Sequence, residues 1–199
     1  MTTTFFLVRH AAHDRVGTIL CGRMPEVRLG AIGHSQARRL AERFANENIA
    51  TVQSSTLERA VETAEPIAAR VGLRVELVEA IGEIDFGAWS GQSFEALQGD
   101  PLWTAWNTAR GESRPPRGES MREAQARIVG HLDHLRGLYR SKSVILVSHG
   151  DVIKSALLHH LGLPLDAYGR FDIDPASVTT LAVGDWGAKI IRMNEVLAA

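Results

Sequence analysis

Phe5-Phe-Leu-Val-Arg9-His10 is a short, unbroken apolar run that ends in a basic pair, and Val144-Ile-Leu-Val-Ser148-His149-Gly150 repeats this pattern later in the chain. Continuous runs rich in β-branched and aromatic residues are typical of strands that are buried on both faces of a parallel sheet. Ligands of open α/β sheets gather at the carboxyl ends of the strands. We therefore expect Arg9, His10 and His149 to lie at one edge of a sheet.

Helical spacing of apolar residues separates and follows these strands. It predicts helices over positions 37–44, 57–71, 121–139 and 153–161, and weaker apolar runs predict further strands near 50–53, 75–78, 178–183 and 190–193. A repeated order of strand, helix and strand favours an α/β fold, here a three-layer α/β/α sandwich with a mostly parallel sheet. We expect one domain over residues 1–199.

Positions 85–118 differ from the rest of the chain, because they are rich in glycine, proline and tryptophan and show little periodicity. The aromatic side chains in this segment should pack against other parts of the protein. We therefore interpret it as an inserted lid or loop, not as a linker.

Composition excludes several classes of protein. The 199 residues are 45% hydrophobic and 23% charged, which indicates a globular domain with a core, and the net charge of -1 provides no positive field for nucleic acid or an anionic membrane. Cys21 is the single cysteine, so an internal disulfide and a paired-cysteine zinc site are excluded. No secretory leader and no membrane-spanning run is apparent, so we expect a soluble, cytoplasmic protein.

Common catalytic signatures are missing, including the GxxxxGK[ST] phosphate loop, GxGxxG, GxSxG and HExxH. Two histidines at neighbouring strand ends beside an arginine would instead suit a nucleophile and a stabiliser of an anionic transition state. Either histidine taken alone is better explained by a structural role.

Four segments together are more specific than any one of them. In chain order they are Leu7-Val-Arg-His10, Ser54-Ser-Thr-Leu-Glu-Arg59-Ala-Val-Glu-Thr63-Ala, Glu83-Ile-Asp-Phe-Gly87-Ala-Trp89-Ser-Gly91 and Val147-Ser-His149-Gly150. This series resembles the histidine phosphatase superfamily, also called the phosphoglycerate mutase-like family, over nearly the whole chain.

The resemblance implies roles for five residues. His10 would be the nucleophile that becomes phosphorylated, Arg9 and Arg59 would hold the phosphoryl oxygens, and His149 would complete the pocket. Glu83 would be the general acid and base, for which a carboxyl group with a raised pKa is suited. Two guanidinium groups can supply the charge neutralisation that phosphoryl transfer needs, so no metal and no other cofactor is expected.

The chain departs from the family pattern after the nucleophile. The usual glycine, glutamate or glutamine, and threonine are replaced by Ala11-Ala12-His13, and the asparagine that follows is missing. His13 is a candidate replacement for a lost phosphate contact, and Arg23 and Gly150 are further candidates for contact with the substrate.

The sequence as a whole predicts a metal-independent phosphatase that hydrolyses a small phosphorylated metabolite through a phosphohistidine intermediate. Other functions remain open at this level: a phosphoglycerate mutase-type phosphoryl transferase, or a phosphate-binding regulator of the same fold without turnover. A phosphoramidase or a phosphoprotein phosphatase also remains open, because the same pocket could accept a P–N bond or a protein loop. The oligomeric state is equally open, with a homodimer as one arrangement.

Overall fold

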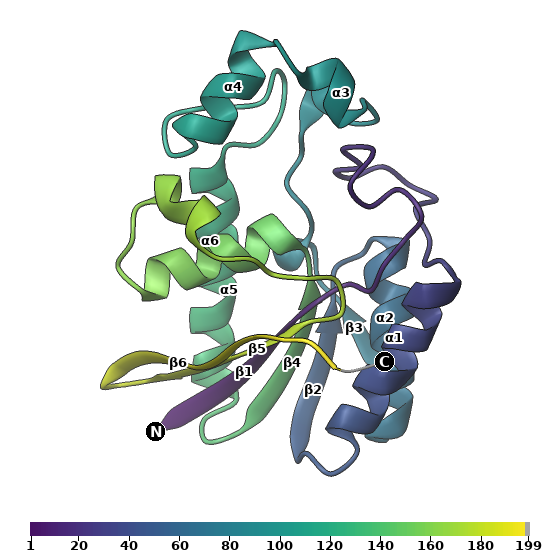
Figure 1. Ribbon diagram of the computed structural model, residues 1–199. Helices are drawn as coiled ribbons and strands as arrows, with labels where there is room; N and C mark the ends of the chain where they lie inside the picture. Colours follow the sequence, from purple (N-terminus) through teal and green to yellow (C-terminus); the bar gives the residue numbers. More distant parts are fainter. Residues whose placement is uncertain (198–199) are drawn as a thin grey trace.

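The computed structural model describes residues 1–197, which form a six-stranded sheet with helices on both faces (Figure 1). The strands are β1 (Thr2–Arg9), β2 (Ile49–Ser54), β3 (Val75–Leu77), β4 (Ser143–Ser148), β5 (Val178–Gly184) and β6 (Gly187–Glu195). Their order is β3-β2-β4-β1-β5-β6, with parallel pairing from β3 to β1 and antiparallel pairing on both sides of β5. The predicted sandwich with a mostly parallel sheet is confirmed.

Each face of the sheet carries its own core. Side chains alternate along β1, so that Phe5 and Leu7 join a cluster with helices α5 (Met121–Leu138) and α6 (Gly150–His160). Phe6 and Val8 point the other way, into a cluster with α1 (Ala31–Phe44) and α2 (Glu58–Arg70). The unbroken apolar runs are explained by this burial on two sides.

Close packing holds the loop after β1 against α1. A Cβ atom on Gly33, in the first turn of α1, would overlap the carbonyl oxygen of Ala12. The same oxygen accepts a hydrogen bond from the backbone N–H of Gly30 at 3.2 Å. The loop that begins with His10 is therefore fixed by helix packing.

Residues 85–118 stand above the carboxyl end of the sheet (Figure 1) and contain the short helices α3 (Phe94–Leu97) and α4 (Pro101–Thr108) and the 3₁₀ turn η2 (Gly87–Trp89). Helices this short show no clear period in the sequence. Their local signals are the capping residues, because Ser93 and Asp100 each accept a hydrogen bond from the first turn, and a proline opens α4.

The aromatic side chains of this segment form a packed group. Trp89 and Trp106 are buried, and Phe86 meets Trp106 edge to face with ring centroids 5.9 Å apart. Trp103 packs edge to face on Trp89 at 5.3 Å. We call positions 85–118 the lid segment.

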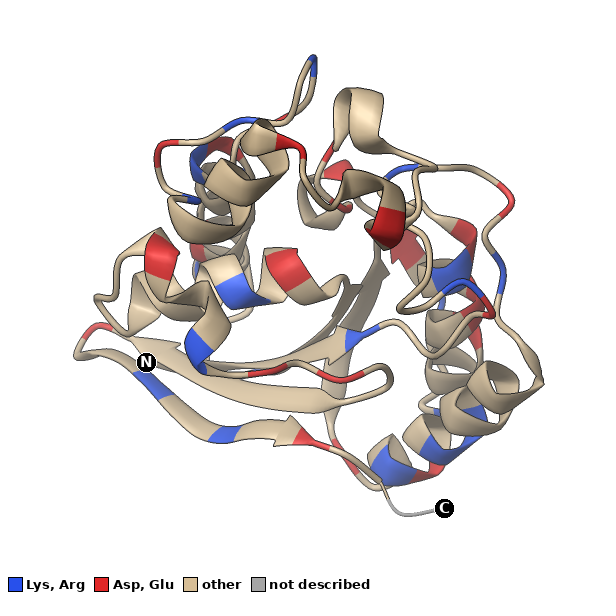
Figure 2. Cartoon of the chain, turned by 45° about the horizontal axis from the view of Figure 1, so that its top comes forward, with Lys and Arg blue, Asp and Glu red and all other residues tan. Residues whose placement is uncertain are grey.

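Charged residues of both signs are interspersed over the helices and loops rather than gathered on one face (Figure 2). Two further 3₁₀ turns, η1 (Glu79–Ile81) and η3 (Leu165–Arg170), lie before the lid segment and after α6. Across positions 1–197, no helix has the length and apolarity needed to cross a membrane.

Candidate active site

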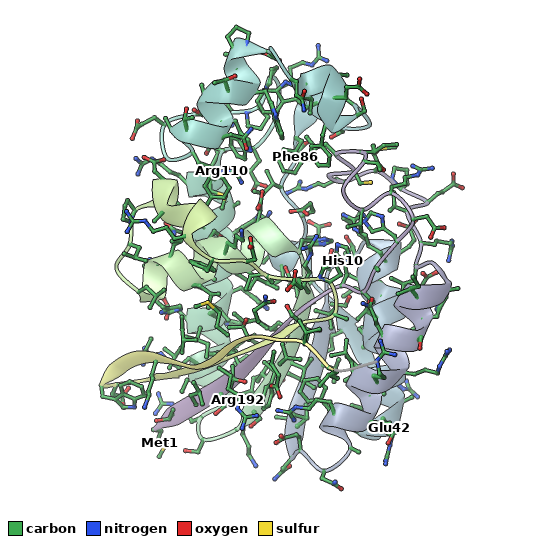
Figure 3. The ribbon with its side chains drawn as sticks, viewed as in Figure 1. Met1, His10, Glu42, Phe86, Arg110 and Arg192 are labelled. Carbon is green, nitrogen blue, oxygen red and sulfur yellow. The ribbon has the colours of Figure 1, made fainter. Side chains whose placement is uncertain are left out.

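The two histidines that follow β1 and β4 meet because those strands are neighbours in the sheet. Arg9 pairs in register with Ser148, so His10 and His149 leave the sheet side by side, with ring centroids 5.2 Å apart. Both rings are buried. Figure 3 shows His10 at the carboxyl edge of the sheet, below Phe86 of the lid segment.

His10 is oriented by its own loop. Its Nδ1 lies 2.8 Å from the carbonyl oxygen of Ala11, which accepts the Nδ1 proton, so the ring lone pair is on Nε2, where it accepts a hydrogen bond from Arg59 Nε at 3.4 Å. Burial lowers the pKa of His10 well below its ordinary value, and the charges of Arg59 and Arg9 lower it further. The imidazole is therefore neutral and nucleophilic at neutral pH.

Arg59, near the start of α2, lies between the two histidines. Its Nη2 donates to the carbonyl oxygen of Gly22 at 2.7 Å and lies 3.4 Å from His149 Nδ1, while its Nε lies 3.4 Å from His10 Nε2. Gly22 adopts a φ of 51°, a conformation that favours glycine and aims this carbonyl at the guanidinium. The buried Nη1 of Arg59 has no hydrogen-bond partner within residues 1–197, so it can bind a phosphoryl oxygen.

Arg9 supplies a second guanidinium, held by the carbonyl oxygen of Ile173 at 2.6 Å from Nη1. A Cβ atom on Gly150 would lie 3.4 Å from this guanidinium, at ordinary van der Waals contact, so Arg9 lies directly against the start of α6. Gly150 is the first residue of α6, and a helix N-terminus adds positive potential for an anion.

His149 is positioned by a residue that the sequence had not singled out. Its Nε2 forms a 2.8 Å hydrogen bond with the Ser55 hydroxyl, directly after β2, so Nδ1 faces Arg59 and a Glu83 oxygen at 3.7 Å. Burial is the main cause that lowers the pKa of His149 well below its ordinary value.

Glu83 follows η1 and points its carboxyl group toward the histidines. The side chain is 14% exposed, and one oxygen accepts a hydrogen bond from the N–H of Ile84 at 2.9 Å. Burial, aided by the negative charge of Asp151, raises the pKa of Glu83 to about 7 against the opposing charge of Arg59. A carboxyl group with this pKa can donate a proton near neutral pH and accept one afterwards.

Arg9, His10, Arg59 and Glu83 line a cavity of about 250 Å³ that also contacts the lid segment through Phe86 and Phe94. His149 is fully buried and is not one of the lining residues. The far wall of the cavity carries Asp151, Lys154, Asp172 and Asp174, none of which the sequence analysis identified. Lys154 and Asp172 form an ion pair at 3.3 Å. The cavity therefore combines two guanidinium groups, those of Arg9 and Arg59, with a wall that carries charges of both signs.

Of the other two residues predicted to contact the substrate, the structure places His13 at the cavity but not Arg23. His13 lines the cavity and stacks on His10, with ring centroids 5.3 Å apart and planes inclined by 26°. Burial and the charge of Arg59 lower the pKa of His13 to about 4. Arg23 is not brought to the cavity wall, because its guanidinium contacts the Glu83 carbonyl oxygen and the Glu119 carboxylate.

Two side chains that hold the nucleophile loop were also missed. Thr63 Oγ1 accepts from the N–H of Ala11, and Gln36 Oε1 accepts from the N–H of Ala12, both at 2.9 Å. Gln36 lies on α1 and Thr63 on α2, and each stands beside the buried apolar positions of its helix, which was the available signal. No group of three or more metal-ligating side chains gathers anywhere in the described part of the chain.

Comparisons with known proteins identify the family to which this fold belongs. A family model described as the histidine phosphatase superfamily (branch 1) matches residues 5–196. Phosphoserine phosphatase 1 of Hydrogenobacter thermophilus is 28% identical over 190 residues, covering 94% of this chain and 90% of the relative. A probable phosphoglycerate mutase, GpmB of Yersinia enterocolitica, is 31% identical over 179 residues, covering 87% of this chain and 82% of the relative.

A solved structure shows the same fold. A phosphoserine phosphatase mutant from Entamoeba histolytica, in complex with phosphoserine, superposes with a TM-score of 0.88 at 27% identity, covering 98% of each chain. The resemblance inferred from the four sequence segments is confirmed.

Proposed function

Because the chain belongs to the histidine phosphatase superfamily, branch 1, we propose that it hydrolyses a phosphate monoester of a small metabolite through a phosphohistidine on His10. The observation that carries this proposal is the arrangement of a neutral His10 between two guanidinium groups, with the Glu83 carboxyl on the same cavity. Nucleophile, anion-binding groups and proton donor are then all supplied by the chain.

In the first step, His10 Nε2 attacks phosphorus and the bond to the leaving oxygen breaks. Arg9 and Arg59 neutralise the phosphoryl oxygens, and two buried nitrogens that have no hydrogen-bond partner within residues 1–197, Arg9 Nε and Arg59 Nη1, provide donors for them. Glu83 gives its proton to the leaving oxygen, so an alcohol departs instead of an alkoxide.

In the second step, water attacks the phosphohistidine and Glu83, now a carboxylate, accepts the proton from that water. The bond between phosphorus and Nε2 breaks, and inorganic phosphate and neutral His10 are regenerated. Charge neutralisation comes from protein cations throughout, so the proposed mechanism uses no metal.

The cavity suits a phosphoryl group with a small polar substituent. Its far wall offers Lys154 for a carboxylate and Asp172 and Asp174 for a cation or hydroxyl groups. Phosphoserine, which is named with two of the relatives, carries both a carboxylate and an ammonium group and is the first substrate to test.

A mutase is the second candidate, favoured by the similarity to a probable phosphoglycerate mutase. Such an enzyme would return the phosphoryl group from His10 to a bound acid, and interconversion of 2- and 3-phosphoglycerate without release of phosphate would identify it. A regulator that only binds phosphate would neither release inorganic phosphate nor interconvert the two phosphoglycerates.

The test combines turnover with trapping. Phosphate release from phosphoserine and p-nitrophenyl phosphate, measured in a buffer with excess EDTA, should persist in the natural chain and disappear in His10→Ala. Substrate labelled in the phosphoryl group should leave an alkali-stable, acid-labile label on the His10 peptide. Activity restored only by added metal, or a label on His149, would contradict the mechanism.

A further inference from the structure

We propose that Arg127 and Glu119 are positioning residues for Glu83, and that this ion pair sets the distance over which the carboxyl group transfers its proton. Neither residue lines the catalytic cavity. The inference rests on the proposed function, since it assigns a role to groups that act through the Glu83 general acid.

Arg127, in the middle of α5, holds the turn on which Glu83 stands. Its Nη1 donates to the carbonyl oxygen of Ala80 at 2.8 Å, and its Nη2 donates to the carbonyl oxygen of Glu83 itself at 3.1 Å. One rigid guanidinium plane therefore spans both ends of the segment from Ala80 to Glu83.

Glu119 orients that guanidinium and holds the chain on the other side of Glu83. Its two carboxylate oxygens accept from Arg127 Nε at 2.7 Å and Nη2 at 3.0 Å. Its backbone N–H donates to the carbonyl oxygen of Asp85 at 2.7 Å. The side chains of Arg127 and Glu119 are only 18% and 15% exposed, so this bidentate pair is shielded from water.

Arg23 completes the arrangement from the opposite direction. Its Nε donates to the Glu83 carbonyl oxygen at 2.7 Å, and its Nη2 contacts Glu119 at 3.0 Å. The carbonyl oxygen of Glu83 thus accepts from two guanidinium groups. Arg23 is 45% exposed, however, and we expect it to contribute less than the shielded pair.

Glu83 needs this support because it belongs to no helix or strand. The residue lies in the irregular segment between η1 and η2. Its carboxyl group makes one hydrogen bond in the described part of the chain, to the neighbouring N–H of Ile84, and that bond does not fix the segment in space. A displacement of about 1 Å at a proton donor can lower the rate about 100-fold.

The pair of Arg127 and Glu119 acts on the position of Glu83 more than on its pKa. Arg127 is neutralised by Glu119, and the groups that most strongly shift the pKa of Glu83 are its burial, Asp151 and Arg59. Loss of the pair should therefore reduce the rate of proton transfer while leaving the pH at which Glu83 titrates nearly unchanged.

The experiment compares Arg127→Lys with Glu83→Gln on two leaving groups in the full chain. The phosphorylation step is followed by rapid quench, with glycerol 2-phosphate as the substrate that needs a proton and p-nitrophenyl phosphate as the one that needs it least. For Glu83→Gln we expect a loss of about 10² to 10⁴ on glycerol 2-phosphate and a much smaller loss on the aryl ester.

For Arg127→Lys we expect the same dependence on the leaving group, but smaller losses of rate than in Glu83→Gln. The rate on glycerol 2-phosphate should fall about 10- to 100-fold, with less than about a threefold change on p-nitrophenyl phosphate and in KM. Added to Glu83→Gln, the substitution should cost less than about twofold more, because the two residues act in series.

Arg122→Lys is the matched control. Arg122 lies on the same helix and also joins a carbonyl oxygen and a carboxylate, those of Gly111 and Glu112, but it does not contact the Glu83 segment. Its rates on both substrates should stay near those of the natural chain. If Arg127→Lys unfolds, as judged by its Tm, then Glu119→Gln replaces it, since this variant keeps side-chain size.

The outcomes separate the two proposals. Leaving-group dependence in Glu83→Gln but equal losses for both substrates in Arg127→Lys would overturn the positioning role alone. An additive loss in the double variant, or an equal loss in Arg122→Lys, would overturn it as well. Equal losses in Glu83→Gln itself would remove Glu83 from the acid role and the present inference with it.

Discussion

Burial acts in opposite directions on the pKa values of the two residues that perform the proposed chemistry. It lowers the pKa of His10 and raises that of Glu83, because in each case the neutral form is favoured away from water. A nucleophile must be neutral to attack and a general acid must be protonated to donate. One physical cause, desolvation of a small cavity, therefore prepares both partners near pH 7.

Arg59 shows how closely charge and shape are combined at a single residue. A lysine could supply the charge but not the fork that reaches Gly22 and both histidines and that, in the proposed mechanism, also binds a phosphoryl oxygen. We expect Arg59→Lys to lose about 1.5 to 3 kcal/mol of transition-state stabilisation, or about one to two decades in kcat/KM.

The measurement is steady-state kinetics on p-nitrophenyl phosphate. Arg28→Lys is the control, because Arg28 is 66% exposed and pairs with Glu62 at the surface, so its kcat/KM should be unchanged. Equal activity of Arg59→Lys and the natural chain would show that net charge alone matters at this position.

At the scale of elements, the lid segment is tied to the catalytic layer by Arg110. This residue follows α4, is 4% exposed, and forms an ion pair at 2.6 Å with Asp151 in the first turn of α6. Its guanidinium also lies over the rings of Trp106 and Tyr168, with 4.6 Å and 3.5 Å to the centroids. The lid and the cavity wall are thus parts of one packed unit.

Removing this arginine should destabilise the whole domain. Arg110→Leu leaves Asp151 without its partner, and we expect the free energy of unfolding to fall by about 3 kcal/mol, the lower end for a broken buried pair because Asp151 is 27% exposed. Urea unfolding measures the loss. The double variant Arg110→Leu with Asp151→Asn should recover part of it, and no recovery would mean that ring packing dominates.

For the whole molecule, the buried site makes stability depend on pH. Unfolded histidine binds a proton near pH 6.5, while folded His10 and His149 resist it, so the free energy of unfolding should fall as pH drops below 6.5. Glu83 acts in the opposite direction, because its pKa rises from 4.5 to about 7 on folding and its contribution is lost as pH rises through that window.

His13, whose pKa is lowered to about 4, acts in the same direction as His10 and His149. These three histidines outweigh the single glutamate, so we expect the natural chain to lose stability from pH 6.5 to 5 in urea titrations. His149→Asn should make this dependence shallower by about 1.4 kcal/mol per pH unit, the equivalent of one proton. Glu83→Gln should make it steeper. Parallel curves for all three proteins would contradict the assignment of these protonation states.

The sequence by itself determined the sheet and the part of the site that lies at its strand ends. Buried strands such as β1 and β4 can be recognised in the sequence as short apolar runs. The residues at the end of each run must lie at the carboxyl edge of the sheet, and this placed Arg9, His10 and His149 there. The order of the four segments matches the sequence pattern of the family. That match identified the family and added Arg59 and Glu83 to the candidate site residues.

Only the tertiary structure decided which side chains hold these groups in position and which charged groups line the rest of the cavity. Ser55 meets His149 across 94 positions, Arg127 meets Glu83 across 44, and Arg110 meets Asp151 across 41. The sequence does not reveal polar contacts of this kind through periodicity or local propensity, because each partner is a polar residue whose local sequence gives no sign of its distant partner. They arise when packing of the helices and the lid on the sheet excludes water and leaves each buried polar group with its partner.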